Sequence, residues 1–272
     1  MDDMVRDFSI VGQSIPRVEG FDKVTGRAEF TDDIDLHGMV YAKVYCSPVA
    51  HGKIKKVDIS KAEKYPGVLA VITGDECPKK YSVNDLLPTE TALAVDKVRY
   101  FGEGISAVAA ISEQIASEAV ELIEVEIEEL PAVVTAQESA EQTDNLIHQE
   151  YPNNTNHTAE QIFGDVDDAL VRADVVVEET FYTSMVNGGF LEPQSAVADY
   201  DPGKKKMTVY NCNQLAHMLQ HTVAKTIDMP LDDIRVIIPN VGGGFGGKTE
   251  ATPSVLITCL LSRKLGRPVK LT

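Results

Sequence analysis

The residues best suited to chemistry form a glycine-rich run near the end of the sequence. Residues 242–247 contain five glycines in six positions, and Lys248 and Thr249 follow them. Glycine tolerates positive φ, so such a loop can turn its backbone N–H groups toward one point. The helix predicted after the loop adds the positive end of its dipole. The sequence therefore predicts an anion-binding loop.

A phosphate-binding loop of the nucleotide hydrolases is one interpretation of this run. Residues 242–249 match the pattern G-x-x-x-x-G-K-[ST], and they stand between a predicted strand and a predicted helix as that motif requires. That loop normally follows the first strand of its domain, with the magnesium-binding acidic strand downstream. Little sequence follows Lys248 here. A nucleotide-binding protein is thus an alternative hypothesis, weakened by the order of its parts.

Two further interpretations of the run are weaker on the residues alone. Gly242, Gly244 and Gly247 also satisfy G-x-G-x-x-G, but no acidic residue lies beyond Glu250 to hold a ribose. The run could equally be a turn that lets a helix pack close to a strand.

Histidines and cysteines suggest no rival site. Of the six histidines, only His217 and His221 share a helix face, and no third ligand is evident. The four cysteines are far apart and form no Cys-x-x-Cys pair, which indicates reduced thiols and no zinc site.

Five motifs follow one another along the chain. They are residues 17–26 (RVEGFDKVTG), residues 164–167 (GDVD), residues 191–193 (LEP), Gln214, and residues 242–248 (GGGFGGK). In this order they resemble the large, molybdenum-binding subunit of the xanthine dehydrogenase and aldehyde oxidase family. The resemblance runs along nearly the whole chain, and it is more specific than the glycine run alone.

The resemblance implies a fold, a reaction and a set of partners. The fold is an α/β hammerhead domain followed by the incomplete first part of a mixed α/β molybdopterin-binding domain. The reaction is hydroxylation of a small molecule with water as the oxygen source. Electrons then pass to 2Fe-2S and FAD on an iron-sulfur subunit and a FAD subunit. The cofactor is molybdenum-molybdopterin, with or without a cytosine dinucleotide tail.

The resemblance also assigns roles to individual residues. Gln214 would place its amide against a molybdenum oxygen ligand, without binding the metal itself, because an amide N–H donates at any working pH. Gly244, Phe245 and Gly246 would contact the cofactor, and glycine there would allow close approach. Thr249 would contact the substrate.

The chain departs from the family pattern in two ways, one of which concerns the substrate and the other the general base. Purine-oxidising members carry Glu directly after the lysine, where this chain has Thr249 and then Glu250. The substrate therefore stays open among purines, nicotinate-like heterocycles, aldehydes and aromatic acyl-CoA compounds. The family's general base is a Glu near the far C-terminus, so we expect no catalytic residue in this chain. We predict that it is inactive without the remaining molybdopterin-binding portion or subunit.

The first half of the chain predicts a mixed α+β domain, complete in itself, over residues 13–140. Runs rich in Val, Ile, Tyr and Ala alternate with turn residues and one amphipathic helix. The predicted strands are 39–47, 53–59, 68–73, 105–111 and 124–130, and the helix is 113–123. Residues 132–158 are polar and aperiodic, as in a connection between domains.

The second half, residues 158–272, alternates helices and strands. Helices are predicted at 165–172, 215–228 and 253–265, the last with Thr252 as N-cap and Gly266 as its end. Strands are predicted at 174–183, 195–200, 206–213, 234–239 and 269–271. The last helix is apolar nearly all round, so burying it needs more protein. We therefore expect the final strand to open a sheet that residues elsewhere complete.

Composition excludes several classes of partner. The chain has 272 residues and a net charge of −17, which repels nucleic acid and anionic membrane surfaces. No apolar run approaches the roughly 18 residues of a membrane span, and the first residues do not resemble a signal peptide. We expect a cytoplasmic protein that is a molybdenum hydroxylase subunit, with a P-loop protein or a non-catalytic scaffold fragment as alternatives.

Overall fold

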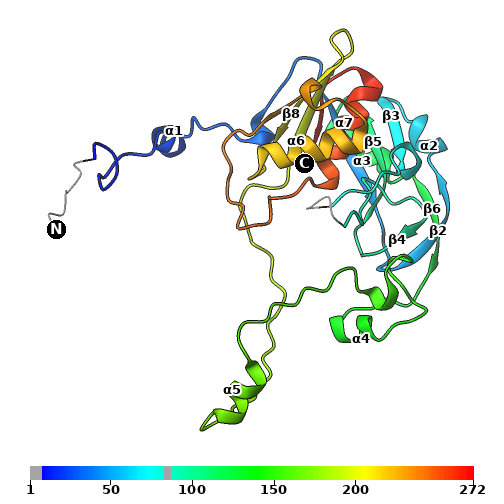
Figure 1. The fold of residues 1–272 in the computed structure, drawn as a ribbon. Helices are drawn as coiled ribbons and strands as arrows, with labels where there is room; N and C mark the ends of the chain where they lie inside the picture. Colours follow the sequence, from blue (N-terminus) through cyan, green and yellow to red (C-terminus); the bar gives the residue numbers. More distant parts are fainter. Residues whose placement is uncertain (1–7, 83–86) are drawn as a thin grey trace.

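Both halves of the chain contribute strands to one seven-stranded mixed sheet (Figure 1). The computed structural model describes residues 8–82 and 87–272. The strand order is β3 (Val68–Thr73), β5 (Gly104–Ala110), β1 (Val40–Cys46), β10 (Val269–Leu271), β7 (Ala196–Asp201), β8 (Lys206–Asn211) and β9 (Ile234–Ile237). A small second sheet has the order β4 (Lys97–Val98), β2 (Gly52–Asp58) and β6 (Glu124–Glu129).

The last strand joins the two halves. β10 pairs in parallel with β1, with Val40 opposite Val269, and antiparallel with β7, with Ala198 opposite Val269. We expected a first half complete in itself and a final strand at the opening of a sheet. Instead β10 lies inside the sheet, paired with β1 on one side and with β7 on the other, and Val269 and Leu271 are buried. Three residues are too few to reveal their neighbours from sequence.

The helices cover the sheet much as their sequence patterns predict. α7 (Pro253–Leu265) begins at its proline and ends at Gly266, whose φ of 62° allows the left-handed cap. Its residues 255–262 are all buried. α6 (Ala216–Ile227) buries a stripe that includes Leu219, Val223 and Ile227. α3 (Glu113–Val120) begins where the Ser112 hydroxyl accepts a hydrogen bond from the Ile115 N–H.

The remaining helices are short. They are α1 (Gly20–Thr25), α2 (Ser60–Glu63), α4 (Ala136–Ala140) and α5 (Val166–Arg172). Apart from α4 and a turn at Pro152–Asn154, residues 132–158 are irregular, as predicted. None of the helices in the described residues is long and apolar enough to cross a membrane.

The predicted strand at residues 174–183 is absent from the structure. These residues form no helix or strand, and they are exposed. The Val, Phe and Tyr side chains do favour a strand, but a strand also needs a neighbour to accept its backbone hydrogen bonds. The described residues supply no such neighbour, and α5 projects away from the sheet together with this segment (Figure 1).

Candidate functional site

The glycine loop connects β9 to α7 and holds a left-handed backbone at three positions. Gly243, Phe245 and Gly246 have φ of 97°, 47° and 86°. The Gly247 N–H donates to the Gly244 carbonyl at 2.7 Å, which closes a tight turn. Positive φ is unfavourable for phenylalanine, and such strain concentrates at functional sites. The loop thus maintains a costly conformation around its one large side chain.

This conformation leaves polar and apolar groups available at the same point. Among the described residues, the N–H groups of Gly243, Gly244, Phe245 and Gly246 find no hydrogen-bond acceptor. The Phe245 side chain is 76% exposed. Four consecutive N–H groups of the loop are therefore unpaired next to an exposed aromatic residue, and Gly244 among them is buried against Gln214.

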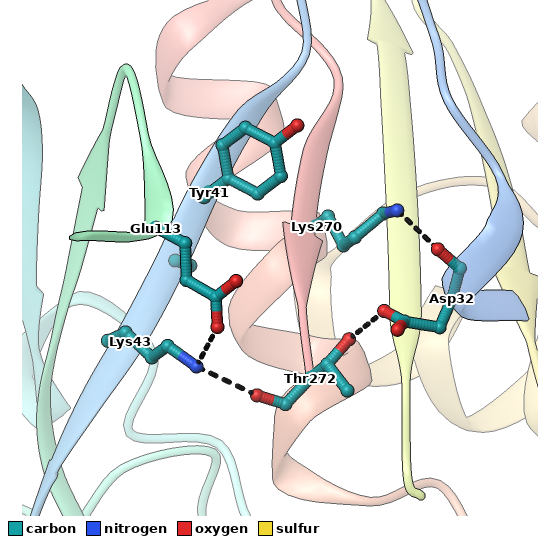
Figure 2. A pocket seen from close by; sticks show the side chains of 7 residues that line it. Asp32, Tyr41, Lys43, Glu113, Lys270 and Thr272 are labelled. Carbon is teal, nitrogen blue, oxygen red and sulfur yellow. Dashed lines mark hydrogen bonds and ion pairs between the residues drawn. The ribbon is translucent and has the colours of Figure 1, made fainter. Parts of the chain in front are cut away.

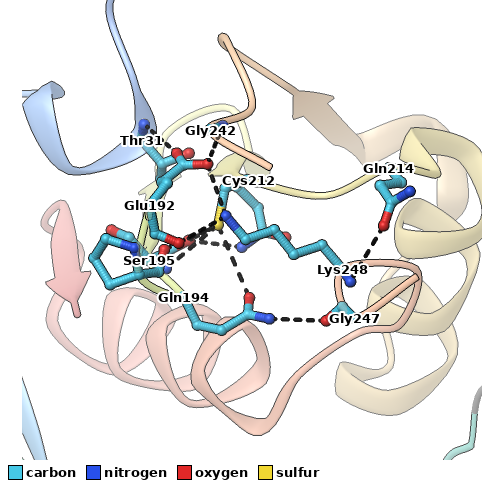
Figure 3. A network of polar contacts seen from close by, with 11 residues as sticks. Thr31, Glu192, Gln194, Ser195, Cys212, Gln214, Gly242, Gly247 and Lys248 are labelled. Atoms are coloured by element: carbon cyan, nitrogen blue, oxygen red, sulfur yellow. Dashed lines mark hydrogen bonds and ion pairs between the residues drawn. The ribbon is translucent and has the colours of Figure 1, made fainter. Parts of the chain in front are cut away.

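Gln214, three residues after the end of β8, lies directly against the loop. Its backbone N–H donates to the Lys248 carbonyl at 2.7 Å, and its side-chain Oε1 accepts from the Lys248 N–H at 3.3 Å. Figure 3 shows this contact. The bond to Oε1 holds the side-chain amide in place through its oxygen. The amide nitrogen, Nε2, has no acceptor among the described residues. A Cβ on Gly244 would lie 2.5 Å from Oε1, so only glycine fits under the amide.

Lys248 points into the protein and not into the loop. Its Nζ lies 2.7 Å from Oε2 of Glu192 and 3.0 Å from the Glu192 carbonyl oxygen. It also lies 4.6 Å from the centre of the Phe190 ring. The side chains of Lys248 and Glu192 are 0% and 6% exposed. This ammonium therefore neutralises a buried carboxylate and is not available to a phosphate.

The phosphate-binding loop is not supported by this geometry. Its lysine is engaged elsewhere, and α7 begins only at Pro253, four residues after Thr249. In that motif the helix starts at the loop itself, so that its N-terminal end faces the phosphates.

Glu192 holds the start of the loop. Its Oε2 also accepts from the Gly242 N–H at 2.7 Å, and its Oε1 accepts from the Thr31 N–H at 3.5 Å (Figure 3). The Glu192 N–H donates back to the Gly242 carbonyl at 3.3 Å. At the other end of the loop, the Gln194 amide donates to the Gly247 carbonyl at 3.0 Å.

The sequence reasoning assigned no role to Glu192. It appeared only within the motif at 191–193, and its partner lies far along the chain. The sequence did contain one signal for this ion pair. Glu192 and Lys248 have opposite charges, and each is the charged residue of a motif that otherwise contains small or apolar residues.

Thr249 lies at the end of the loop and is partly exposed. Its hydroxyl donates to the Gly246 carbonyl at 3.0 Å, so its oxygen keeps only acceptor capacity toward a ligand. Gln214, Gly244, Phe245, Gly246 and Thr249 are thus brought together in one place. Within the described residues, no group of three or more His, Cys, Asp or Glu side chains is placed to hold a metal ion.

A hollow lies beside β1 and β10 (Figure 2). The Lys43 Nζ lies 2.6 Å from Oε1 of Glu113 and 3.3 Å from the Thr272 carbonyl. The Thr272 hydroxyl donates to Asp32 at 2.7 Å. These polar groups satisfy one another, so this hollow is a structural junction between the two halves and not a second site.

Comparison with known proteins decides the family. Residues 25–131 match the model of the aldehyde oxidase and xanthine dehydrogenase a/b hammerhead domain, and residues 147–272 match that of the molybdopterin cofactor-binding domain. The chain is 34% identical over 269 residues to the nicotinate dehydrogenase large molybdopterin subunit of Eubacterium barkeri. The chain belongs to the xanthine dehydrogenase and aldehyde oxidase family. The fold class expected from the motifs is confirmed.

Other members of the family agree with this assignment. The xanthine dehydrogenase molybdenum-binding subunit of Escherichia coli is 30% identical over 266 residues, which is 94% of this chain. The quinoline 2-oxidoreductase structure from Pseudomonas putida 86 superimposes with a TM-score of 0.86 over 96% of this chain, at 31% identity. The chain covers 62% of the nicotinate dehydrogenase subunit, 35% of the Escherichia coli subunit and 34% of the quinoline enzyme chain.

The residues present fit the molybdopterin cofactor that family members bind. The cofactor offers phosphate, oxo and other acceptor groups, and the loop offers free N–H donors. Because a Cβ at Gly244 would collide with the Gln214 amide, the close packing of loop and amide depends on glycine. Gln214 adds a donor that does not titrate.

Proposed function

We propose that this chain forms one wall of the molybdenum-molybdopterin site in a hydroxylase of the xanthine dehydrogenase and aldehyde oxidase family. One observation carries the proposal. The N–H groups of residues 243–246 and the Nε2 of Gln214 have no acceptor among the described residues, the Gln214 side chain packs against Gly244, and the neighbouring Phe245 is exposed. A set of fixed donors without internal acceptors suits a ligand rich in oxygen acceptors.

When bound, the cofactor would supply oxygen transfer from water and take up two electrons. The chain's own residues would bind and orient it. Gln214 would donate one hydrogen bond from Nε2 to an oxygen on the molybdenum, with its other end fixed by Lys248. The loop N–H groups would donate to further acceptors. The Phe245 ring would cover the site and exclude water.

An N-heterocycle is the substrate class we favour. The names of the matched relatives include nicotinate, xanthine, nicotine and quinoline, which are all nitrogen heterocycles, although carbon monoxide and an aldehyde are also named. At Thr249 only acceptor capacity remains, since its hydrogen is bonded to Gly246. It would therefore accept a hydrogen bond from a substrate that carries a ring N–H, as xanthine does, whereas the pyridine-type nitrogens of nicotinate and quinoline are themselves acceptors and would not bond to it.

The chain would not act alone. We propose that the general base comes from the remaining molybdopterin-binding portion or subunit, and that 2Fe-2S and FAD lie on partner subunits or domains. The isolated 272-residue chain would then be inactive. The domain limits 13–140 and 158–272 and the cytoplasmic location also stay predictions.

The test is metal and activity analysis of the natural protein, purified from its own organism with its bound partners. We expect about one molybdenum with pterin per chain, and dye reduction with nicotinate or quinoline. The isolated 272-residue chain should show neither. An intact assembly without molybdenum, or with tightly bound Mg-ATP, would contradict the proposal. Failure to find either ligand would favour a non-catalytic scaffold.

A further inference from the structure

An exposed apolar arm leads from α5 to the glycine loop. We define the arm as residues 174–186. Its side chains at Val175, Val177, Phe181, Tyr182 and Met185 are 77%, 77%, 86%, 86% and 101% exposed. Figure 1 shows the arm and α5 extending away from the seven-stranded sheet. Single exposed apolar residues are ordinary, but a contiguous run of this size marks an interaction surface.

The backbone of the arm is also unpaired. Within the described residues, none of its N–H or carbonyl groups makes a hydrogen bond. Its composition favours a strand, as the sequence predicted, and a strand without a neighbour offers both rows of its backbone groups for pairing. The arm therefore has the two features needed to add itself to a sheet: strand-forming residues and free backbone groups.

We propose that the arm is a docking strand that pairs with a strand in the remaining region of the molybdopterin subunit. That region is the part of the relatives' length outside this chain's match, whether it lies on the same polypeptide or on a second one. The chain covers 62% of one relative and about a third of others, and the matched cofactor-binding model includes the arm. The proposal deepens the proposed function, because it names where the missing part of that site attaches.

Charge indicates the character of the docking partner. Asp174, Glu178 and Glu179 lie among the apolar residues of the arm, and the whole chain carries a net charge of −17. A second copy of this chain would bring the same acidic residues against them. A strand with apolar residues and basic flanks would instead be complementary.

Docking of the arm would reach the glycine loop directly. The arm leads into Phe190. A Cβ on Gly243 would lie only 3.2 Å from the Phe190 Cβ, and the Phe190 ring centre lies 4.6 Å from Lys248 Nζ. Two residues later, Glu192 holds Gly242 and Lys248. Ordering the arm against a partner would therefore restrain Phe190 and Glu192, which both contact the loop.

The experiment compares the natural assembly with the isolated 272-residue chain. A photo-reactive amino acid replaces Val177, and mass spectrometry identifies the peptide to which it cross-links in the assembly. Amide hydrogen exchange of residues 174–186 is measured in both samples. We expect exchange at least about 100-fold slower in the assembly. The expected cross-link lies in sequence that aligns with the unmatched part of the relatives.

Lysine variants supply a control. The double variant Val175→Lys with Val177→Lys should remove most of the protection of the arm, because buried charges would oppose docking. Val134→Lys, at an apolar position that is 87% exposed in the connection between the two halves, should leave it unchanged.

Two results would overturn the proposal: a cross-link to residues 174–186 of a second copy, or an arm that exchanges freely in the intact assembly. Neither readout uses turnover. An assembly with a docked arm but no molybdenum would contradict the proposed function alone, and an active assembly with a free arm would contradict only the docking strand.

Discussion

The Lys248 ammonium lies 2.7 Å from the Glu192 carboxylate, and both side chains are almost completely removed from water. The pair connects the glycine loop to the segment that follows the arm, and through Thr31 to the first half of the chain. A lysine that would reach a phosphate in a nucleotide hydrolase is used here to hold the loop. The N–H groups of Gly242 and Gly247 are bonded within the protein, and those of residues 243–246 have no acceptor among the described residues.

Breaking this pair on one side should destabilise the protein. Glu192→Gln leaves the Lys248 ammonium buried without a counter-charge, and we expect a loss of about 3 kcal/mol or more in the free energy of unfolding. Adding Lys248→Met to that variant removes the stranded charge and should recover part of the loss. Urea denaturation followed by circular dichroism measures both, since the chain contains no tryptophan.

Lys204→Met is the matched control for this prediction. Lys204 pairs with Asp201 at 3.0 Å, but its side chain is 76% exposed. Its loss should change stability by less than about 1 kcal/mol. Equal effects of the buried and the exposed substitution would show that the Glu192–Lys248 pair has no special structural role.

A methyl group at Gly244 should displace the Gln214 amide. Gly244 does not have positive φ, so the backbone of Gly244→Ala is unstrained, and the cost comes from the 2.5 Å approach to Oε1. We expect reduced molybdenum content and a loss of roughly 1–3 kcal/mol in stability. Combining it with Gln214→Ala should restore stability but not molybdenum content. Additive stability losses in that double variant would argue against the contact.

Gly246→Ala provides the comparison for Gly244→Ala. Its Cβ meets nothing within 4 Å, but its φ is 86°. It should lower stability by about 1 kcal/mol through backbone strain. Gln214 should stay in place.

Replacing the Gln214 amide should affect the metal more than the fold. Gln214 is exposed and its Nε2 contacts no acceptor within the described part of the chain. Gln214→Glu should therefore change the free energy of unfolding by less than about 0.5 kcal/mol. In the loaded assembly it should alter the electron paramagnetic resonance signal of Mo(V), because a donor is lost at a molybdenum oxygen. An unchanged signal with full molybdenum content would contradict the assigned contact.

The connection after the first half should make stability depend on pH. His51 Nδ1 lies 2.8 Å from the Pro131 carbonyl, which fixes residue 131 against the small sheet. Burial lowers the pKa of His51, and the charges of Lys97 and Arg99 lower it further, whereas the bond to Pro131 opposes this shift. The unfolded chain therefore binds this proton more readily. Stability should be full above the ordinary histidine pKa near 6.5 and fall as the pH drops below it.

His51→Asn should flatten that pH dependence, and it keeps a donor near the Pro131 carbonyl. His157→Asn, at an exposed histidine, serves as the matched control. Thermal unfolding between about pH 5 and 8 measures the three proteins, and a His51 variant that keeps the full slope would remove His51 as its cause.

The elements that could be predicted from sequence are those with local signals. α7 has its start at Pro253 and its end at Gly266 written in adjacent residues, and the structure confirms both. β10 could not be placed, because its neighbours in β1 and β7 are set by packing across the whole chain. Residues 174–183 show the opposite case: strand propensity is present, and the described residues contain no partner that would make a strand.

The candidate site shows the same division. The family resemblance implied that Gln214 and residues 244–246 would contact one cofactor, and the structure places the Gln214 side chain against Gly244. The role of Glu192 could not be predicted, because an ion pair between residues 192 and 248 leaves no trace in local spacing. Burial decides such pairs, and burial is known only once the loop is folded.

A structure of the natural assembly loaded with cofactor is the most direct test of the whole account. We predict a molybdenum oxygen ligand within about 2.7–3.2 Å of Gln214 Nε2, and cofactor acceptors facing the N–H groups of residues 243–246. The account is contradicted if the cofactor lies elsewhere, and these N–H groups meet only protein or hold a nucleoside triphosphate.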